Sequence, residues 1–313
     1  MLNLDKIEKT ELIDCSVLFF QDNKERLDKF LFVQFPEYSR SYFQQLINNG
    51  LIQINNKFID KSSYKIKKTD IIKINFPEEK QFDLTPKKID FEIIDIQNDF
   101  IVINKPAGLI VHHSERTSSE EITLVNGLLY KFKELNQLKD NQRPGIVHRL
   151  DKGTSGLLIV ARNIFGQIKL ASMFKKREIK KHYLAIVKGQ PPKKGKIDFS
   201  IGRHPCKGHM MSHTSPMGKK ALTYFEVLKY YKDCSLILVH IVTGRTHQIR
   251  VHLAAIGHGL IGDDLYGYQS KLISRPALHA WKLAFDYKGK KFNHSKHVPQ
   301  DFRNLLFKLN NNN

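Results

Sequence analysis

The chain has 313 residues, of which 41% are hydrophobic and 10% aromatic, so disorder is excluded for most of it. Lys and Arg number 51 against 31 Asp and Glu, which leaves a formal net charge of +20. Because so much charge of one sign repels itself, the composition predicts an anionic partner, with nucleic acid as the leading candidate. We find no apolar stretch of membrane-spanning length, and the charged N-terminus is unlike a signal peptide. Three widely spaced cysteines favour a reducing compartment, so we expect a cytoplasmic protein.

Residues 22–76 are predicted to form a small α+β unit. Two helices are indicated by apolar residues that share one face, Leu27, Phe30 and Leu31 in the first and Phe43, Leu46 and Ile47 in the second. Asn55 and Asn56 stand between alternating apolar residues, a pattern typical of a hairpin. The isoleucines that follow, at 71, 72 and 74, predict a further strand.

Basic residues run along this unit, among them Arg26, Lys29 and Arg40. The unit resembles the αL RNA-binding domain of a small-subunit ribosomal protein. The match rests on three short segments, residues 26–28, 39–41 and 50–55. The resemblance implies that these basic side chains contact RNA. The alternative is a small domain whose basic residues are merely solvated, and the order of the elements favours RNA binding.

Residues 77–90 are polar and charged, so we expect a linker there, followed by a second domain over residues 91–307 in which strands dominate. Within that domain a predicted helix ends in a basic run that includes Lys176 and Arg177. The run leads directly into a strand that carries Tyr183. Such runs are usually a solvated helix face, and the alternative here is a track for RNA phosphates.

Asp151 occupies the most informative stretch of the chain. It lies between two apolar segments, residues 146–147 and 157–161, which predict strands covered on both faces. A carboxylate at the mouth of such a framework is held rigidly and partly shielded from water, as a nucleophile requires. Arg149 lies two residues earlier, so in an extended segment the two side chains point the same way. A salt-bridged turn between strands also explains this pattern, and from these residues alone we favour it.

A family resemblance extends the pattern along the chain. Residues 148–151 with 154–158 resemble the catalytic signature of the RluA/RluD family of pseudouridine synthases. Further segments resemble the other motifs of that family in the same order, namely residues 104–109, 181–187, 244–252 with 262–267, and 277–280. Any one motif alone is a weak signal. Because the motifs recur in order from about residue 99 to 285, the resemblance is specific and covers most of the chain.

The resemblance implies a role for each of four residues. Asp151 would be the nucleophile, acting either at C6 of the uracil or at C1′ of the sugar. Arg245 would form a salt bridge that keeps Asp151 ionised, although it could instead cap a turn. Tyr183 would stack on the uracil and help to move the C5 proton. The alternative, and the more common role of such a residue, is a tyrosine that packs in the core. Arg149 would replace the extruded base in the RNA stack, or else contact a phosphate.

The isomerisation of uridine is redox-neutral, so we expect neither a cofactor nor a metal. One cluster of possible ligands invites a zinc interpretation, namely His204, Cys206, His209 and His213. We reject it because the cluster has a single cysteine and no Cys-x-x-Cys pair.

We therefore expect an α/β (α+β) chain in which the small αL domain precedes a catalytic domain with a mixed, largely antiparallel sheet flanked by helices. It should act as a monomer on large-subunit ribosomal RNA or its precursor particle, without a membrane, and residues 203–220 favour that substrate over tRNA. The alternatives are a non-catalytic RNA-binding or ribosome-assembly protein, a tRNA-acting synthase and a glycoside hydrolase. Loss of Asp151 would mark the first, and a second carboxylate near Asp151 would mark the last.

Overall fold

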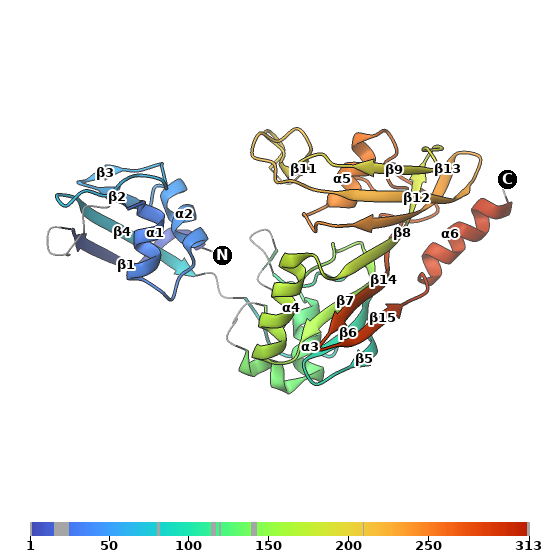
Figure 1. Ribbon diagram of the computed structural model, residues 1–313, viewed down its shortest axis with the longest axis horizontal. Coiled ribbons are helices and arrows are strands. Elements are labelled where there is room, and N and C mark those ends of the chain that lie inside the picture. The colour runs from blue at the N-terminus through green and yellow to red at the C-terminus, as the bar shows by residue number, and fades with distance from the viewer. Residues whose placement is uncertain are drawn as a thin grey trace. The chain divides into compact units, whose positions relative to one another are not determined.

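The computed structural model describes residues 2–15, 25–79, 82–113, 117–118, 120–138, 143–208 and 210–311. The chain divides into two compact units, Met1–Phe82 and Asp83–Asn313, each with its own apolar core (Figure 1). His209, one of the possible zinc ligands that we rejected, lies outside the described residues. Among the helices that the structure describes, none is long and apolar enough to cross a membrane.

The N-terminal unit packs two helices against a four-stranded sheet of order β1-β4-β2-β3. Its elements are β1 (Leu2–Asp14), α1 (Leu27–Gln34), α2 (Arg40–Asn48), β2 (Ile52–Ile54), β3 (Lys57–Phe58) and β4 (Ile71–Glu79). The order of helices, hairpin and strand agrees with the sequence-based prediction. Two bounds differ from those predicted: β1 precedes residue 22, and β4 continues through 77–79, which we had placed in the linker. Both differences have one cause, because β1 pairs along the whole of β4.

Local chemistry explains the turns of this unit. The Ser39 hydroxyl accepts a hydrogen bond from the Tyr42 N–H at 3.2 Å and so caps α2. Asn55 and Asn56 both have positive φ, 51° and 64°, as a two-residue hairpin turn requires. The apolar faces predicted for both helices are buried in one cluster with the isoleucines of β2 and β4.

The larger unit is built on a nine-stranded sheet of order β5-β6-β7-β14-β8-β13-β12-β9, with β15 beside β14. Its strands are β5 (Glu92–Ile96), β6 (Phe100–Lys105), β7 (Ser155–Ala161), β8 (Lys180–Lys188), β9 (Lys194–Ile197), β12 (Thr223–Tyr230), β13 (Cys234–Ile241), β14 (Leu278–Tyr287) and β15 (Lys290–Ser295). The β7–β14 pair is parallel and the other pairs are antiparallel. The predicted mixed, largely antiparallel sheet is thus confirmed. A short separate pair, β10 (Gly202–Arg203) and β11 (Met211–Ser212), lies outside it.

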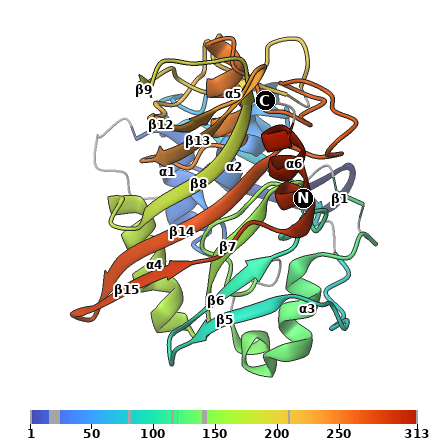
Figure 2. The same cartoon turned by 90° about the vertical axis from the view of Figure 1, so that its right-hand side faces the viewer.

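Helices cover both faces of this sheet (Figure 2). They are α3 (Leu124–Lys131), the 3-10 helix η1 (Lys133–Gln137), α4 (Ile164–Lys176), α5 (Gln248–Ala255) and α6 (Gln300–Asn311). Apolar residues of α3 and α5 share a core with one face, while α4 and α6 pack on residues of the other. Every residue of β7 is buried in consequence, as its continuous apolar run predicted. The last helix extends past residue 307, where we had ended the domain.

The parallel join of β7 and β14 depends on a glycine. Gly156 has a φ of +115°, and a Cβ at this position would overlap the carbonyl oxygen of Ala280 on β14. Only glycine tolerates both the conformation and the close approach. The join holds the loop before β7, which carries Asp151, next to the strands that carry Tyr183 and Leu278.

Candidate active site

The loop that carries Asp151 is held in place by the residues on either side of Asp151 in the sequence. The Ile159 N–H on β7 donates a hydrogen bond to His148 Nε2 at 2.9 Å, and the His148 ring packs against Phe174 of α4 with centroids 4.5 Å apart. Burial lowers the pKa of His148 to about 3, so the ring stays neutral and can accept this bond. Leu150 is buried in the core, and the Asp151 carbonyl accepts a hydrogen bond from the Thr154 N–H at 3.0 Å. The Asp151 side chain therefore starts from a fixed backbone.

Lys105 also stabilises this loop, a role that the sequence did not reveal. Its side chain is fully buried, and Nζ donates hydrogen bonds to the carbonyl oxygens of Pro106, Leu109 and Lys152 at 2.7, 2.8 and 3.3 Å. Burial lowers the pKa of Lys105 to about 7, opposed by the nearby charge of Asp151. The motif at residues 104–109 is thus joined directly to the residue that follows Asp151.

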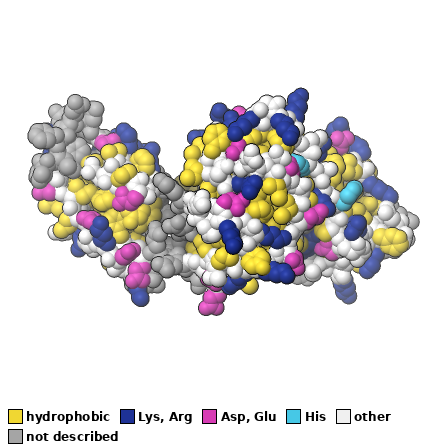
Figure 3. Space-filling model, turned by 90° about the horizontal axis from the view of Figure 1, so that it is seen from below, with side chains coloured by type: hydrophobic (Ala, Val, Ile, Leu, Met, Phe, Trp, Pro, Cys, Tyr) yellow, Lys and Arg dark blue, Asp and Glu magenta, His cyan; other side chains and the backbone are white. Residues whose placement is uncertain are grey.

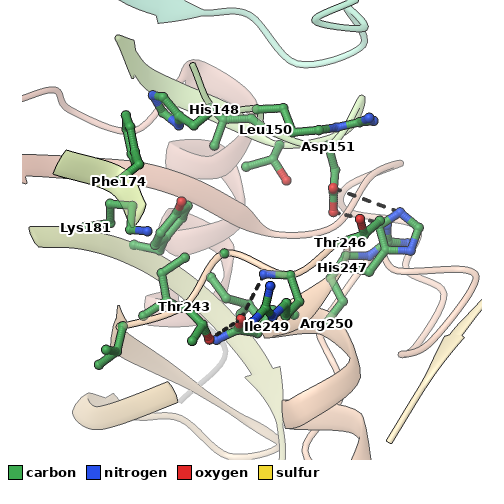
Figure 4. A pocket seen from close by; sticks show the side chains of 18 of the residues that line it. His148, Leu150, Asp151, Phe174, Lys181, Thr243, Thr246, His247, Ile249 and Arg250 are labelled. Carbon is green, nitrogen blue, oxygen red and sulfur yellow. Dashed lines mark hydrogen bonds and ion pairs between the residues drawn. The ribbon is translucent and has the colours of Figure 1, made fainter. Parts of the chain in front are cut away.

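The Asp151 carboxylate has two neighbours at the start of α5, the Arg250 guanidinium and the His247 imidazole, whose pKa is lowered by burial. Arg250 Nη1 lies 3.5 Å from Oδ2, and His247 Nε2 lies 3.9 Å from Oδ1 (Figure 4). Arg250 is itself held by a bidentate pair with the fully buried Asp263, with Nε–Oδ2 and Nη2–Oδ1 distances of 2.7 and 2.8 Å. Asp263 also accepts the backbone N–H of Tyr266. Arg250 is therefore oriented before any substrate arrives.

The predicted ion pair between Arg245 and Asp151 is wrong. Arg245 Nε donates instead to the Lys220 carbonyl oxygen at 3.2 Å, and the Arg245 backbone N–H donates to Gln248 Oε1. Arg245 lies in the turn before α5, at the pocket wall, whereas Arg250 lies inside the helix and reaches Asp151. The motif at 244–252 contains both arginines, so the second one was visible in the sequence but had no distinguishing signal.

A pocket of about 500 Å³ opens beside Asp151. Apolar residues wall it, among them Leu150, Tyr183, Ile249 and Leu278. Tyr183 comes from β8, and its burial raises the pKa of the hydroxyl, so the side chain stays protonated. Arg149 is exposed and, like Asp151, lines both this pocket and a second one. Arg177 and Arg245 also line the first pocket, so five sequence-predicted residues meet there.

The remaining predicted RNA contacts lie elsewhere on the two units. Lys176 is exposed at the end of α4, one residue before Arg177. In the N-terminal unit Lys29 pairs with Glu25 at 3.0 Å. Arg26 and Arg40 both bind the buried Asp28, with Nε–carboxylate distances of 3.0 Å, so part of each guanidinium is committed to the fold. Hydrogen bonds from these arginines and Gln44 outweigh burial and hold the pKa of Asp28 at about 2.

Comparison with known proteins identifies this arrangement. The family described as RNA pseudouridylate synthase matches residues 99–255, and the S4 domain matches residues 25–72. The chain belongs to the RNA pseudouridine synthases. It is 41% identical to an uncharacterized RNA pseudouridine synthase of Aquifex aeolicus over 82% of each chain. It is 35% identical to the ribosomal large subunit pseudouridine synthase D of Haemophilus ducreyi over 90% of each chain.

Solved structures of pseudouridine synthases share the fold. Human RNA pseudouridylate synthase domain containing 1 is 30% identical, with a TM-score of 0.55 over 67% of this chain and 84% of that chain. As a member of this family the protein is an isomerase that converts uridine in RNA to pseudouridine. The predicted family, an enzyme with an RNA-binding domain before the catalytic domain, is confirmed. The rival glycoside hydrolase and non-catalytic RNA-binding protein are set aside.

Proposed function

We propose that this pseudouridine synthase modifies uridines of large-subunit ribosomal RNA and that Asp151 is its nucleophile. The substrate class is supported by the relative of Haemophilus ducreyi, whose name gives that target and which matches 90% of this chain. The observation that carries the nucleophile is the environment of Asp151. Among the described residues that line its pocket it is the one carboxylate, and Arg250 and His247 face it.

We assign separate roles to the other residues in and around the pocket. Arg250, 3.5 Å from the carboxylate and fixed by Asp263, orients Asp151 toward the substrate. Tyr183 offers its ring as a stacking surface and a protonated hydroxyl near the C5 proton. A base within structured RNA must leave the stack to reach this pocket, and the exposed Arg149 at its rim is suited to fill the vacated position. Arg177, Lys176 and Arg245 are placed to receive phosphates at and near the pocket mouth.

The substrate class is tested by mapping pseudouridines in cells that lack the gene, using carbodiimide adducts and primer extension. We expect specific sites in large-subunit RNA to lose the modification and to regain it when the wild-type gene, but not the Asp151→Asn gene, is restored. Loss confined to tRNA would show that the target class is wrong while leaving the chemistry intact.

The S4 domain is proposed to position the enzyme on its RNA through phosphate contacts, with Arg26, Lys29 and Arg40 among them. On the face seen in Figure 3, Lys and Arg side chains are spread over the surface and not gathered in one patch. Deletion of residues 1–82 removes one compact unit together with its own core. We expect weaker RNA binding and poorer site choice, while the catalytic unit still folds.

The salt dependence of binding decides this prediction. Each phosphate contact that is lost should reduce the slope of log K against log salt concentration by about 0.9. Full-length protein should therefore lose affinity for large-subunit RNA more steeply than the truncated form. Equal affinity, slope and modified sites in the two proteins would rule out RNA targeting by the N-terminal unit.

We also infer that the enzyme acts as a monomer in the cytoplasm and needs neither metal nor cofactor. Support for the compartment comes from Cys15, Cys206 and Cys234, which are free thiols. The reaction needs no cofactor because it moves one bond within the same nucleotide and leaves the oxidation state unchanged.

A further inference from the structure

Besides Asp151, the active-site pocket contains the buried charged side chain of Lys181, to which the proposed function assigns no role. Lys181 lies on β8, two residues before Tyr183, so both side chains project from the same face of the sheet into the pocket. Only 8% of Lys181 is exposed. Burial lowers its pKa to about 8, so the ammonium form still predominates at neutral pH.

The Lys181 ammonium has no carboxylate partner. Among the described residues it makes neither an ion pair nor a hydrogen bond, and its recorded contact is with the ring of Phe174, 5.6 Å from Nζ to the centroid. A Cβ added to Gly244 would lie 3.7 Å from Nζ, so the ammonium lies beside the turn before α5, and both residues line the pocket. A buried cation without a partner is costly, and such a group is expected to receive one from a ligand.

The position of Lys181 in the pocket indicates which part of the bound uridine it contacts. Figure 4 shows Lys181 and Phe174 at one end of the pocket and Asp151 at the other. Exposed cations, Lys175, Arg177 and Arg149, already line the mouth, where phosphates would lie. If Asp151 acts at C6 or C1′, the uracil extends away from it and places the oxygen at C4 toward the far end.

We propose that the Lys181 ammonium contacts an exocyclic oxygen of the target uracil and stabilises the negative charge that this oxygen gains during the reaction. The proposal rests on Asp151 as the reacting carboxylate. Attack at C6 would push the C5–C6 electron pair through C4 onto O4. Departure from C1′ would leave the electron pair of the N1–C1′ bond on the uracil, spread over O2 and O4. Both routes thus place charge where a fixed cation can act.

The contact between Lys181 and a uracil oxygen can form both before and after the uracil rotates. Rotation about the axis through N3 and C6 exchanges N1 with C5 and O4 with O2, after which C5 bonds to C1′, C5 loses its proton and N1 gains one. An oxygen therefore faces Lys181 before and after the rotation. A lysine suits this task because its ammonium is a point charge with three rotatable donors, whereas an arginine fork demands one geometry.

The test compares Lys181→Met with Lys181→Arg and with Lys188→Met, an exposed lysine at the other end of the same strand. The substrate is large-subunit RNA transcribed with tritium at C5 of uridine, and the readouts are single-turnover tritium release and RNA affinity. Lys181→Met should slow turnover about 100-fold or more, the usual cost of one lost donor to a developing charge, at unchanged RNA affinity. Lys181→Arg should recover part of the rate, and Lys188→Met should match wild type.

Three outcomes would overturn the proposal. Normal turnover of Lys181→Met, with Asp151→Asn inactive, would remove Lys181 from the reaction and leave the nucleophile in place. Weaker RNA binding with a salt slope smaller by about one would make Lys181 a phosphate contact instead. A lower melting temperature of Lys181→Met with unchanged turnover per folded molecule would make it structural, whereas loss of an unpaired buried charge should leave the melting temperature equal or higher.

Chemical substitution in the RNA tests the contact itself. With 4-thiouridine at the mapped target site, wild-type turnover should fall, since sulfur is a weaker acceptor than oxygen. Lys181→Met should be much less sensitive to the same substitution, because the partner of that oxygen is already missing. Equal sensitivity of both proteins would show that Lys181 does not touch this atom.

Discussion

Replacement of Asp151 with Asn should abolish pseudouridine formation while the fold and the affinity for RNA stay near those of the wild-type enzyme. Asn has almost the same shape as Asp, but its amide cannot bond to carbon as a carboxylate does. We expect turnover to fall by about 10⁴-fold or more, the scale seen when a catalytic nucleophile is lost. Tritium release from RNA labelled at C5 of uridine measures the loss.

Asp286 provides the matched control for this substitution. It is an exposed carboxylate on β14, outside the pocket, so Asp286→Asn should retain full activity. Appreciable turnover by Asp151→Asn would rule out Asp151 as the nucleophile and, with it, the role proposed for Arg250 beside the carboxylate.

Replacement of Arg250 with Met should damage both activity and stability, and should do so far more than Arg245→Met. Arg250 is the bidentate partner of Asp263, which is fully buried. Leaving that carboxylate uncompensated costs about 3–5 kcal/mol of folding free energy. The same change frees Asp151 from its charged neighbour at 3.5 Å. Urea unfolding and tritium release report the two effects separately.

A double variant separates stability from catalysis. Arg250→Met with Asp263→Leu removes both charges of the pair, so stability should largely return while activity stays lost. If Arg245→Met proved the more damaging of the two single changes, the contact between Arg250 and Asp151 would not be the one that catalysis uses.

Much of the fold was readable from local patterns. The apolar faces of α1 and α2 follow from the 3.6-residue period, and the Asn55-Asn56 hairpin follows from turn chemistry. The buried strand β7 follows from its continuous apolar run. Strand β1 was missed because residues 6–10 are exposed and show no apolar alternation. Its pairing with β4 is a tertiary effect that overrides the weak local signal.

The candidate site was predictable only in part, for reasons of geometry. Residues 148–151 stand out because a charged segment interrupts apolar strands, but Arg245 and Arg250 are equally good partners until the start of α5 is known. A shift of a few residues in that start decides which guanidinium points at Asp151. Lys105 was missed for a different reason. A lysine in a motif is usually taken to be an exposed charge, and its burial depends on three carbonyl partners from residues 106–152 that only the folded structure brings together.

The central place of β14 in the sheet bears on when the enzyme becomes competent during its own synthesis. Strand β14 separates β7 from β8, and it joins Ser155 to His279, 124 positions later in the chain. Until residues 278–287 have left the ribosome, the strand with Tyr183 and the loop with Asp151 belong to two half-sheets whose described strands do not pair with each other. Such long-range pairing closes slowly and late. A nascent chain could therefore present its S4 domain to RNA well before it could modify a single uridine.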